Sequence, residues 1–213
     1  MNVRRLIVLG LLSSCALLAQ KWEVGVAGGG SFYTSQAFTG SISSADASFS
    51  TALAASVWLG NDSGRFLGGE VRYDFEASHP QLTSGSDKET LAGQTHAIHY
   101  DFLFHFTPRT SRVRPFVSAG AGIKVYRGTG QELAYQGPLE NVGLLTKMQD
   151  LKPMVSLGAG IKFAVSPSIQ FRVEVHDYLT PFPTNVVTPT FGTKGGGGWL
   201  QDFVPMFGLS FTF

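Results

Sequence analysis

The chain has 213 residues, of which 43% are apolar and 15% are charged, and its formal net charge is +1. Soluble domains carry about 25% charged residues, and nucleic-acid-binding domains are strongly basic. This balance therefore argues against a typical soluble surface and against a nucleic-acid partner. The length fits one domain of barrel or sandwich size, or two small domains.

Residues 1–19 are predicted to be a cleaved signal peptide, and residues 20–213 to be one mature domain. Arg4 and Arg5 give a positive start, an apolar run follows, and Ala19 is a small residue at the expected cleavage position. The apolar run is shorter than the ~20 residues of a membrane-spanning helix. We therefore expect export through the Sec pathway.

The single cysteine, Cys15, lies inside this segment, so the mature chain is expected to lack disulfides and thiolate metal sites. Residues 12–15 (Leu-Ser-Ser-Cys) are similar to a lipoprotein signal, in which Cys15 becomes the lipidated first residue. However, the apolar run continues through Leu17 and Leu18, where lipoproteins turn polar. This continuation favours cleavage after Ala19.

Alternation of apolar and polar residues, which is the period of a half-buried strand, recurs eight times after residue 20. The predicted strands are 21–33, 47–60, 65–77, 94–107, 114–127, 152–165, 168–179 and 199–213. Two of them nearly repeat each other. Pro-Phe-Val-Ser-Ala-Gly-Ala-Gly at 115–122 parallels Pro-Met-Val-Ser-Leu-Gly-Ala-Gly at 153–160, which indicates the same kind of environment for both strands.

Short and long connections alternate between these strands. The short ones fall near 61–64, 108–114 and 166–168, and the long ones near 34–46, 77–93, 127–150 and 180–198. We expect the long segments to be solvent-facing loops, with Gly195 to Gly198 mobile. Their aromatic residues are candidates for contact with a partner, surface sugars or phage: Tyr33, Phe38, Tyr135, Phe182 and Phe191.

Eight such strands close into a barrel with the apolar face either inward around a ligand, as in lipocalins, or outward to lipid. Charges mixed with glycine on the polar face, alternating connection lengths and an apolar final strand favour the outward arrangement. We therefore predict an all-β fold, an eight-stranded antiparallel up-and-down transmembrane β-barrel. A soluble lipocalin-like binder stays as an alternative.

Aromatic residues near the strand ends of the apolar face are typical of the girdle at a membrane interface. The predicted girdle consists of Trp22, Phe32, Phe66, Phe106 and Trp199.

The polar face predicts a barrel interior filled with paired charges. Eight strands leave an interior just wide enough for side chains, and buried charges are tolerated when they are paired. The predicted interior network consists of Glu70, Arg72, Asp74, His99, Asp101, His105, Lys124, Lys162, Arg172, Glu174 and His176. A narrow channel or transporter for small solutes, lined by the same charges, is the alternative.

Catalytic and metal sites were sought among the histidines. His99, Asp101 and His105 share the predicted interior face, but their spacing spreads them over about 20 Å, so one metal ion cannot bind all three. His176 and Asp177 are adjacent, so they point to opposite faces of a strand. We expect no metal, no cofactor and no catalytic residue; an outer-membrane lipid-modifying enzyme remains the alternative.

The signal segment, the stretch at 115–122 with its echo at 153–160, and the final strand resemble the small outer-membrane barrels of the OmpA/OmpX type, in the outer membrane protein β-barrel domain family. This resemblance covers the whole mature chain. It implies a place in the cell outer membrane, contact with lipid and lipopolysaccharide, and a structural or surface-interaction role. We expect a monomer.

The resemblance also implies a role for the last strand. In this family a final strand that ends in phenylalanine is recognised by the barrel-insertion machinery during biogenesis. Here that signal corresponds to Phe207, Leu209, Phe211 and Phe213.

Overall fold

The structure is a computed structural model that describes residues 21–62, 64–131, 139 and 141–213. The predicted signal peptide with Cys15, and the loop residue Tyr135, lie outside the described residues. Within the described ranges, no helix is long and apolar enough to cross a membrane.

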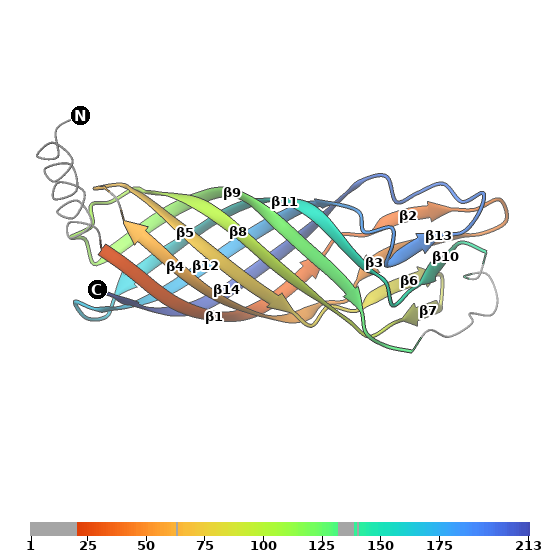
Figure 1. Cartoon of the computed structure of the whole chain (residues 1–213), viewed down its shortest axis with the longest axis horizontal. Coiled ribbons are helices and arrows are strands. Elements are labelled where there is room, and N and C mark those ends of the chain that lie inside the picture. The colour runs from red at the N-terminus through yellow and green to blue at the C-terminus, as the bar shows by residue number, and fades with distance from the viewer. Residues whose placement is uncertain (1–20, 63, 132–138, 140) are drawn as a thin grey trace, which may run out of the picture.

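Eight long strands of the described chain form a closed barrel (Figure 1). They are β1 (Lys21–Tyr33), β4 (Ala52–Asp62), β5 (Leu67–Glu76), β8 (Gly93–His105), β9 (Val113–Gly128), β11 (Gln149–Ala164), β12 (Ile169–Pro181) and β14 (Trp199–Thr212). Each strand pairs antiparallel with its neighbours along the chain, and β1 closes the barrel against β14. The predicted eight-stranded antiparallel up-and-down barrel is confirmed.

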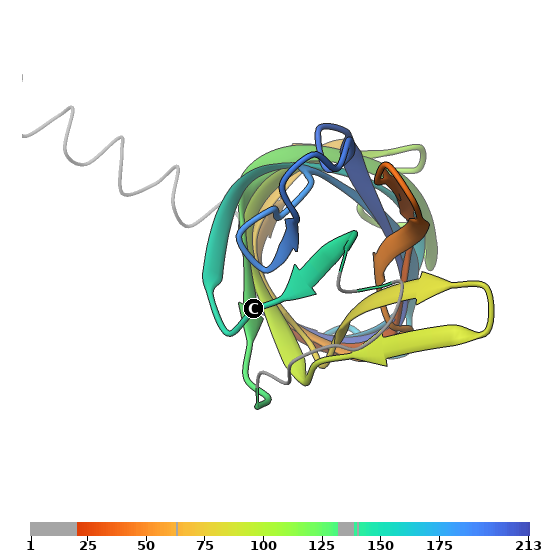
Figure 2. The same ribbon diagram turned by 90° about the vertical axis from the view of Figure 1, so that its right-hand side faces the viewer.

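Six further strands, all short, lie in the described parts of the four long connections. They are β2 (Gln36–Thr39), β3 (Ser44–Phe49), β6 (Pro80–Ser84), β7 (Asp87–Thr90), β10 (Gly143–Leu145) and β13 (Val187–Pro189). They form the sheets β2-β3-β6-β7 and β10-β13. Figure 2 shows these strands over one mouth of the barrel, with the β6–β7 hairpin reaching out to one side.

The prediction of plain loops in these segments is therefore wrong, and so is the start of the second predicted strand. Residues 47–49 belong to β3, and the wall strand β4 begins only at Ala52. Phe49, which falls within the second predicted strand, is instead 4% exposed inside the apolar cluster formed by the long connections. The pairing partner of β3 is β6, from a different connection, so no pattern within a single segment reveals it.

The alternation of each wall strand separates an apolar outer face from a polar inner one. On β8, Ile98, Tyr100 and Phe102 are 44–69% exposed, whereas His99 and Asp101 between them are at most 3% exposed. The apolar face is thus the outer one, and the lipocalin-like alternative, which needs it inward, does not fit this barrel. The same outward face carries the residues of the final strand, which are 49–61% exposed: Phe207, Leu209, Phe211 and Phe213.

The five predicted girdle residues lie at two levels of the outer surface. Trp22 and Phe66 are half-buried and Phe106 is exposed, near the end of the barrel that holds the C-terminus and the short turns. Phe32 and Trp199 are exposed near the other end, where β1 and β14 lead into the short strands. This placement gives the apolar band an aromatic margin on each side.

Closure of the barrel depends on glycine where β1 meets β14. A Cβ atom on Gly29 would lie 1.9 Å from the carbonyl oxygen of Pro205, a backbone atom that cannot move aside alone. We expect Gly29→Ala to lower the free energy of unfolding by about 1–3 kcal/mol, as overpacking does. Urea unfolding of the refolded barrel in detergent measures this.

The neighbouring glycine is the matched control. A Cβ atom on Gly28 would meet only the carbonyl oxygen of Ala54, at 4.0 Å. Gly28→Ala is expected to be neutral or slightly stabilising, because alanine has less backbone entropy to lose. Equal destabilisation by both substitutions would show that the close approach of β1 and β14 is not the cause.

Candidate functional site

Two arginines and two glutamates form a closed square across the middle of the barrel. Arg72 and Glu70 come from β5, and Arg172 and Glu174 come from β12, on the opposite side of the barrel. Arg72 Nη1 lies 2.8 Å from Glu174 Oε1, and Arg172 Nη1 lies 2.7 Å from Glu70 Oε2. Within β5, Arg72 Nη2 lies 3.0 Å from Glu70 Oε1, and within β12, Arg172 Nε lies 2.5 Å from Glu174 Oε2. All four residues are at most 4% exposed.

Aromatic rings pack beside this square. The guanidinium carbons of Arg72 and Arg172 lie 4.8 and 5.0 Å from the ring centre of Trp58, and that of Arg172 lies 4.5 Å from the ring centre of Phe116. Gly25 makes room for this indole, since a Cβ atom there would lie 2.2 Å from Trp58. Cation–π contacts of this kind stabilise the two buried charges in addition to the carboxylates.

A histidine and two aspartates form the next layer. His99 Nε2 lies 2.8 Å from Asp74 Oδ2, and its Nδ1 lies 3.0 Å from Asp101 Oδ1. The imidazole of His99 thus links Asp101 of its own strand to Asp74 of the neighbouring strand β5. His176 Nε2 is 3.2 Å from Glu174 Oε2 and thereby joins this layer to the arginine–glutamate square.

A lysine forms the layer nearest the mouth covered by the short strands. Lys124 Nζ lies 2.9 Å from Glu76 Oε1 and 2.5 Å from Asp202 Oδ2. The three residues come from three different wall strands, β9, β5 and β14. Tyr33 also donates its hydroxyl hydrogen to Glu76, and Ser31 donates to Asp202 at 2.7 Å. This layer again connects opposite parts of the wall through side chains.

The fourth group of charges lies toward the end with the short turns. Lys162 Nζ is 2.6 Å from Glu23 Oε2, and Arg114 Nη1 is 2.6 Å from Asp62 Oδ2. His105 lies at this level, with its ring centre 5.8 Å from that of Phe116, and both of its ring nitrogens lack a hydrogen-bond partner in the described chain. His105 is therefore separate from His99 and Asp101, as their spacing along the strand predicts.

The structure places all eleven residues of the predicted network inside the barrel, each at most 4% exposed. Their partners Glu23, Glu76 and Asp202 were missed. Each shows the same signal as the predicted residues, because each lies at an alternate position of a wall strand, on the polar face. His96, on the same strand as His99, points outward, and its Nδ1 lies 2.7 Å from the Tyr73 hydroxyl. Within the described ranges, no three His, Cys, Asp or Glu side chains are placed to hold a metal ion.

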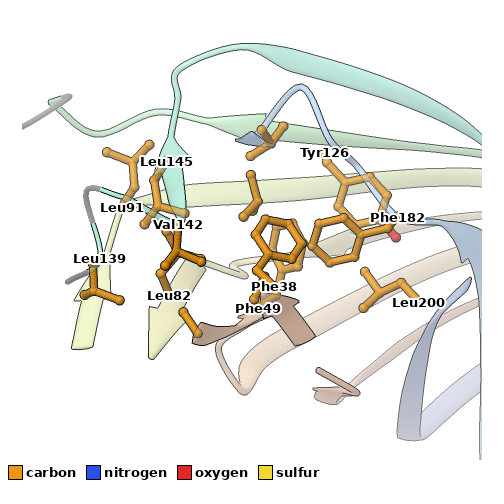
Figure 3. Close-up of a cluster of buried hydrophobic side chains, with 14 residues drawn as sticks. Phe38, Phe49, Leu82, Leu91, Tyr126, Leu139, Val142, Leu145, Phe182 and Leu200 are labelled. Atoms are coloured by element: carbon orange, nitrogen blue, oxygen red, sulfur yellow. The ribbon is translucent and has the colours of Figure 1, made fainter. Parts of the chain in front are cut away.

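An apolar cap covers this polar interior at the mouth where the short strands lie (Figure 3). All four long connections contribute, through Phe38, Ala45, Ala47, Phe49, Leu82, Leu91, Leu139, Val142, Leu145, Phe182, Val186 and Val187, together with Tyr126 and Leu200 of the wall. The rings of Phe38 and Phe182 are 5.6 Å apart, and those of Phe49 and Tyr126 are 5.1 Å apart. Phe38 and Phe182, expected to be free for a partner, are thus buried. Phe191 is fully exposed.

Comparison with solved structures shows a likeness to small outer-membrane barrels. The crystal structure of Neisserial surface protein A matches with a TM-score of 0.52 and 11% identity, over 91% of this chain and 97% of that chain. The N-terminal β-barrel domain of Pseudomonas aeruginosa OprF matches with a TM-score of 0.42 and 15% identity, over 90% and 97% of the two chains. Yersinia pestis Ail, in complex with the heparin analogue sucrose octasulfate, matches with a TM-score of 0.42 and 12% identity, over 90% and 99%.

No protein-family profile matches the sequence, and no curated protein matches it. At 11% identity, the likeness to Neisserial surface protein A shows a shared fold. The predicted resemblance to small eight-stranded outer-membrane barrels is confirmed at the level of the fold.

Proposed function

We propose that the protein is a non-conducting outer-membrane barrel that holds a folded platform for surface interactions above the membrane. The outward apolar face with aromatic residues at both margins supports contact with lipid. Backbone groups of an open sheet are costly in hydrocarbon, and the closed barrel leaves none unpaired at an edge. The proposal includes a monomer, contact with lipopolysaccharide, recognition of the strand ending at Phe213 by the insertion machinery, and no catalysis.

The arginine–glutamate square is the observation that carries the non-conducting part of the proposal. Arg72 and Glu174 join strands on opposite sides of the barrel, so the square lies across the path that a solute would follow. Breaking a buried pair leaves an uncompensated charge at a cost of about 3–5 kcal/mol. An ion that passes would have to disrupt such pairs, and the apolar cap adds a second barrier.

The cap and its two sheets support the surface-interaction part. The described parts of the four connections share one buried apolar cluster, so these parts pack together as a unit. Exposed apolar side chains remain on this unit, including Ile42 at 79% and Phe191 at 109% exposure. A preorganised surface loses less conformational entropy on binding than free loops lose.

Planar-bilayer recording of the purified, refolded protein tests the non-conducting interior. We expect no steady single-channel steps. The change in gel mobility between unboiled and boiled samples of the same preparation verifies that the barrel is closed. Phe38→Ala, which loosens the cap but leaves the interior ion pairs intact, is also expected to show no single-channel current. Steady, large steps from the wild-type barrel would instead support the channel alternative.

A further inference from the structure

A cationic cavity opens at the end of the barrel opposite the cap. It has a volume of about 230 Å³ and lies between the β8–β9 and β11–β12 connections. Its wall includes Arg109 and Arg112 from the first connection and Arg114 and Lys162 from the barrel interior. A water molecule takes about 30 Å³ in the liquid, so the cavity has room for a compact oxyanion with several waters.

The charges around this cavity do not balance. Asp62 compensates Arg114, and Glu23 compensates Lys162, each at 2.6 Å. In the described part of the chain, no carboxylate forms an ion pair with Arg109 or Arg112, and none lines the cavity. Two positive charges are therefore left over, which match the one to two negative charges of a phosphoryl group.

Arg114 supplies a second, independent sign of a missing ligand. Its residue is 3% exposed, and Nη1 binds Asp62, whereas Nε and Nη2 lack any hydrogen-bond partner in the described chain. These two nitrogens form one edge of the guanidinium, with parallel N–H bonds suited to two oxygens of one anion. A buried charged donor without a hydrogen-bond partner destabilises the folded state. An oxygen-bearing group bound in the cavity would accept hydrogen bonds from this edge and remove that cost.

We propose that this cavity binds a phosphoryl group, with the open edge of Arg114 as its inner anchor and Arg109 and Arg112 at its rim. The hydroxyl groups of Thr110, Ser111 and Ser166 line the same wall and can donate to the remaining oxygens. The phosphoryl group comes either from free phosphate or from a phospholipid headgroup. Only the lipid source rests on the proposed membrane location.

The test uses the folded protein in two arms. In detergent, titration with inorganic phosphate is followed by ³¹P NMR line broadening. In nanodiscs that contain phosphatidylglycerol and phosphatidylcholine, native mass spectrometry measures which lipid stays bound. Arg109→Gln with Arg112→Gln is expected to weaken binding at least about tenfold, because it removes two charge-assisted contacts.

Two further variants separate a built site from diffuse charge. Arg65→Gln removes one exposed arginine in the β4–β5 connection at the same end of the barrel and is expected to leave binding unchanged. Arg114→Lys keeps the charge but loses the two-nitrogen edge, so it is expected to weaken binding. The mobility shift of unboiled samples confirms that each variant is folded.

Saturable phosphate binding with this variant pattern supports the free anion as the source. Selective retention of phosphatidylglycerol with the same pattern, without phosphate binding, supports the headgroup. Absence of both, or equal weakening by Arg65→Gln, overturns the proposal. Steady conductance of the wild-type barrel would count against the proposed function alone, since phosphate binding in detergent does not depend on it.

Discussion

Arg72→Ala is expected to lower the free energy of unfolding by about 3–5 kcal/mol, the cost of breaking a buried ion pair from one side. Without the guanidinium, Glu174 still pairs with Arg172 but loses its 2.8 Å ion pair with Arg72 across the barrel. Glu70 likewise loses its 3.0 Å ion pair with Arg72. Two carboxylates then share one arginine inside the barrel. Urea unfolding followed by tryptophan fluorescence reports on this site, because Trp58 stacks on Arg72.

Two controls distinguish lost pairing from lost side-chain volume. Arg127→Ala removes an exposed arginine near the far end of β9 and is expected to change stability by less than about 0.5 kcal/mol. Arg72→Met with Glu174→Gln removes one charge of each sign and is expected to recover at least half of the loss, since apolar replacements of buried pairs are often tolerated. A double variant as unstable as Arg72→Ala would contradict the role assigned to the pairing.

Phe38→Ala is expected to destabilise the cap by about 3–5 kcal/mol, as truncation of a buried phenylalanine does. The side chain is fully buried and packs edge-on against Phe182 of another connection, so its loss separates two of the four segments. Hydrogen exchange of β2, β3 and β13 is expected to accelerate. Exchange of the barrel wall and the mobility shift are expected to stay as in the wild type.

Phe191→Ala is the matched control, because the same truncation is made in the same group of connections at a side chain that is 109% exposed. We expect no change in exchange there. If β2 and β3 of the wild-type protein already exchange as fast as in Phe38→Ala, the four connections do not form one packed unit. The proposed platform would then lose its support.

The strands of the barrel wall were predictable because their pattern of apolar and polar residues lies within each strand's own sequence. On β8, Ile98 and Tyr100 alternate with His99 and Asp101, and this period fixes both the strand and its two faces. The choice between an inward and an outward apolar face needed the chemistry of the polar side, where charges and glycines share a narrow space. Both steps use only residues that are neighbours in sequence.

The cap and the pairings inside the barrel depend on contacts that are distant in sequence. Phe49 continues the alternation toward β4, yet it packs on Tyr126 of β9. Arg72 was placed on the interior face, but its partner Glu174 lies 102 positions away, and several acidic residues on that face are equally compatible with it. Periodicity identifies the face of a strand, whereas the partner across the barrel depends on stagger and closure.

The shared cluster of the cap also decides where the outer surface can change. Gly143 sits where a Cβ atom would approach Leu82 and Phe38 at 3.3 and 3.4 Å, so the β10 segment is tied to two other connections. At the tip of the β6–β7 hairpin, Gly85 has nothing within 4 Å of such an atom, although its φ of 59° favours glycine at that one position. On the proposed surface platform, insertions would thus be tolerated at such a hairpin tip, whereas substitutions in the packed segments beneath it would require compensating changes in the other connections.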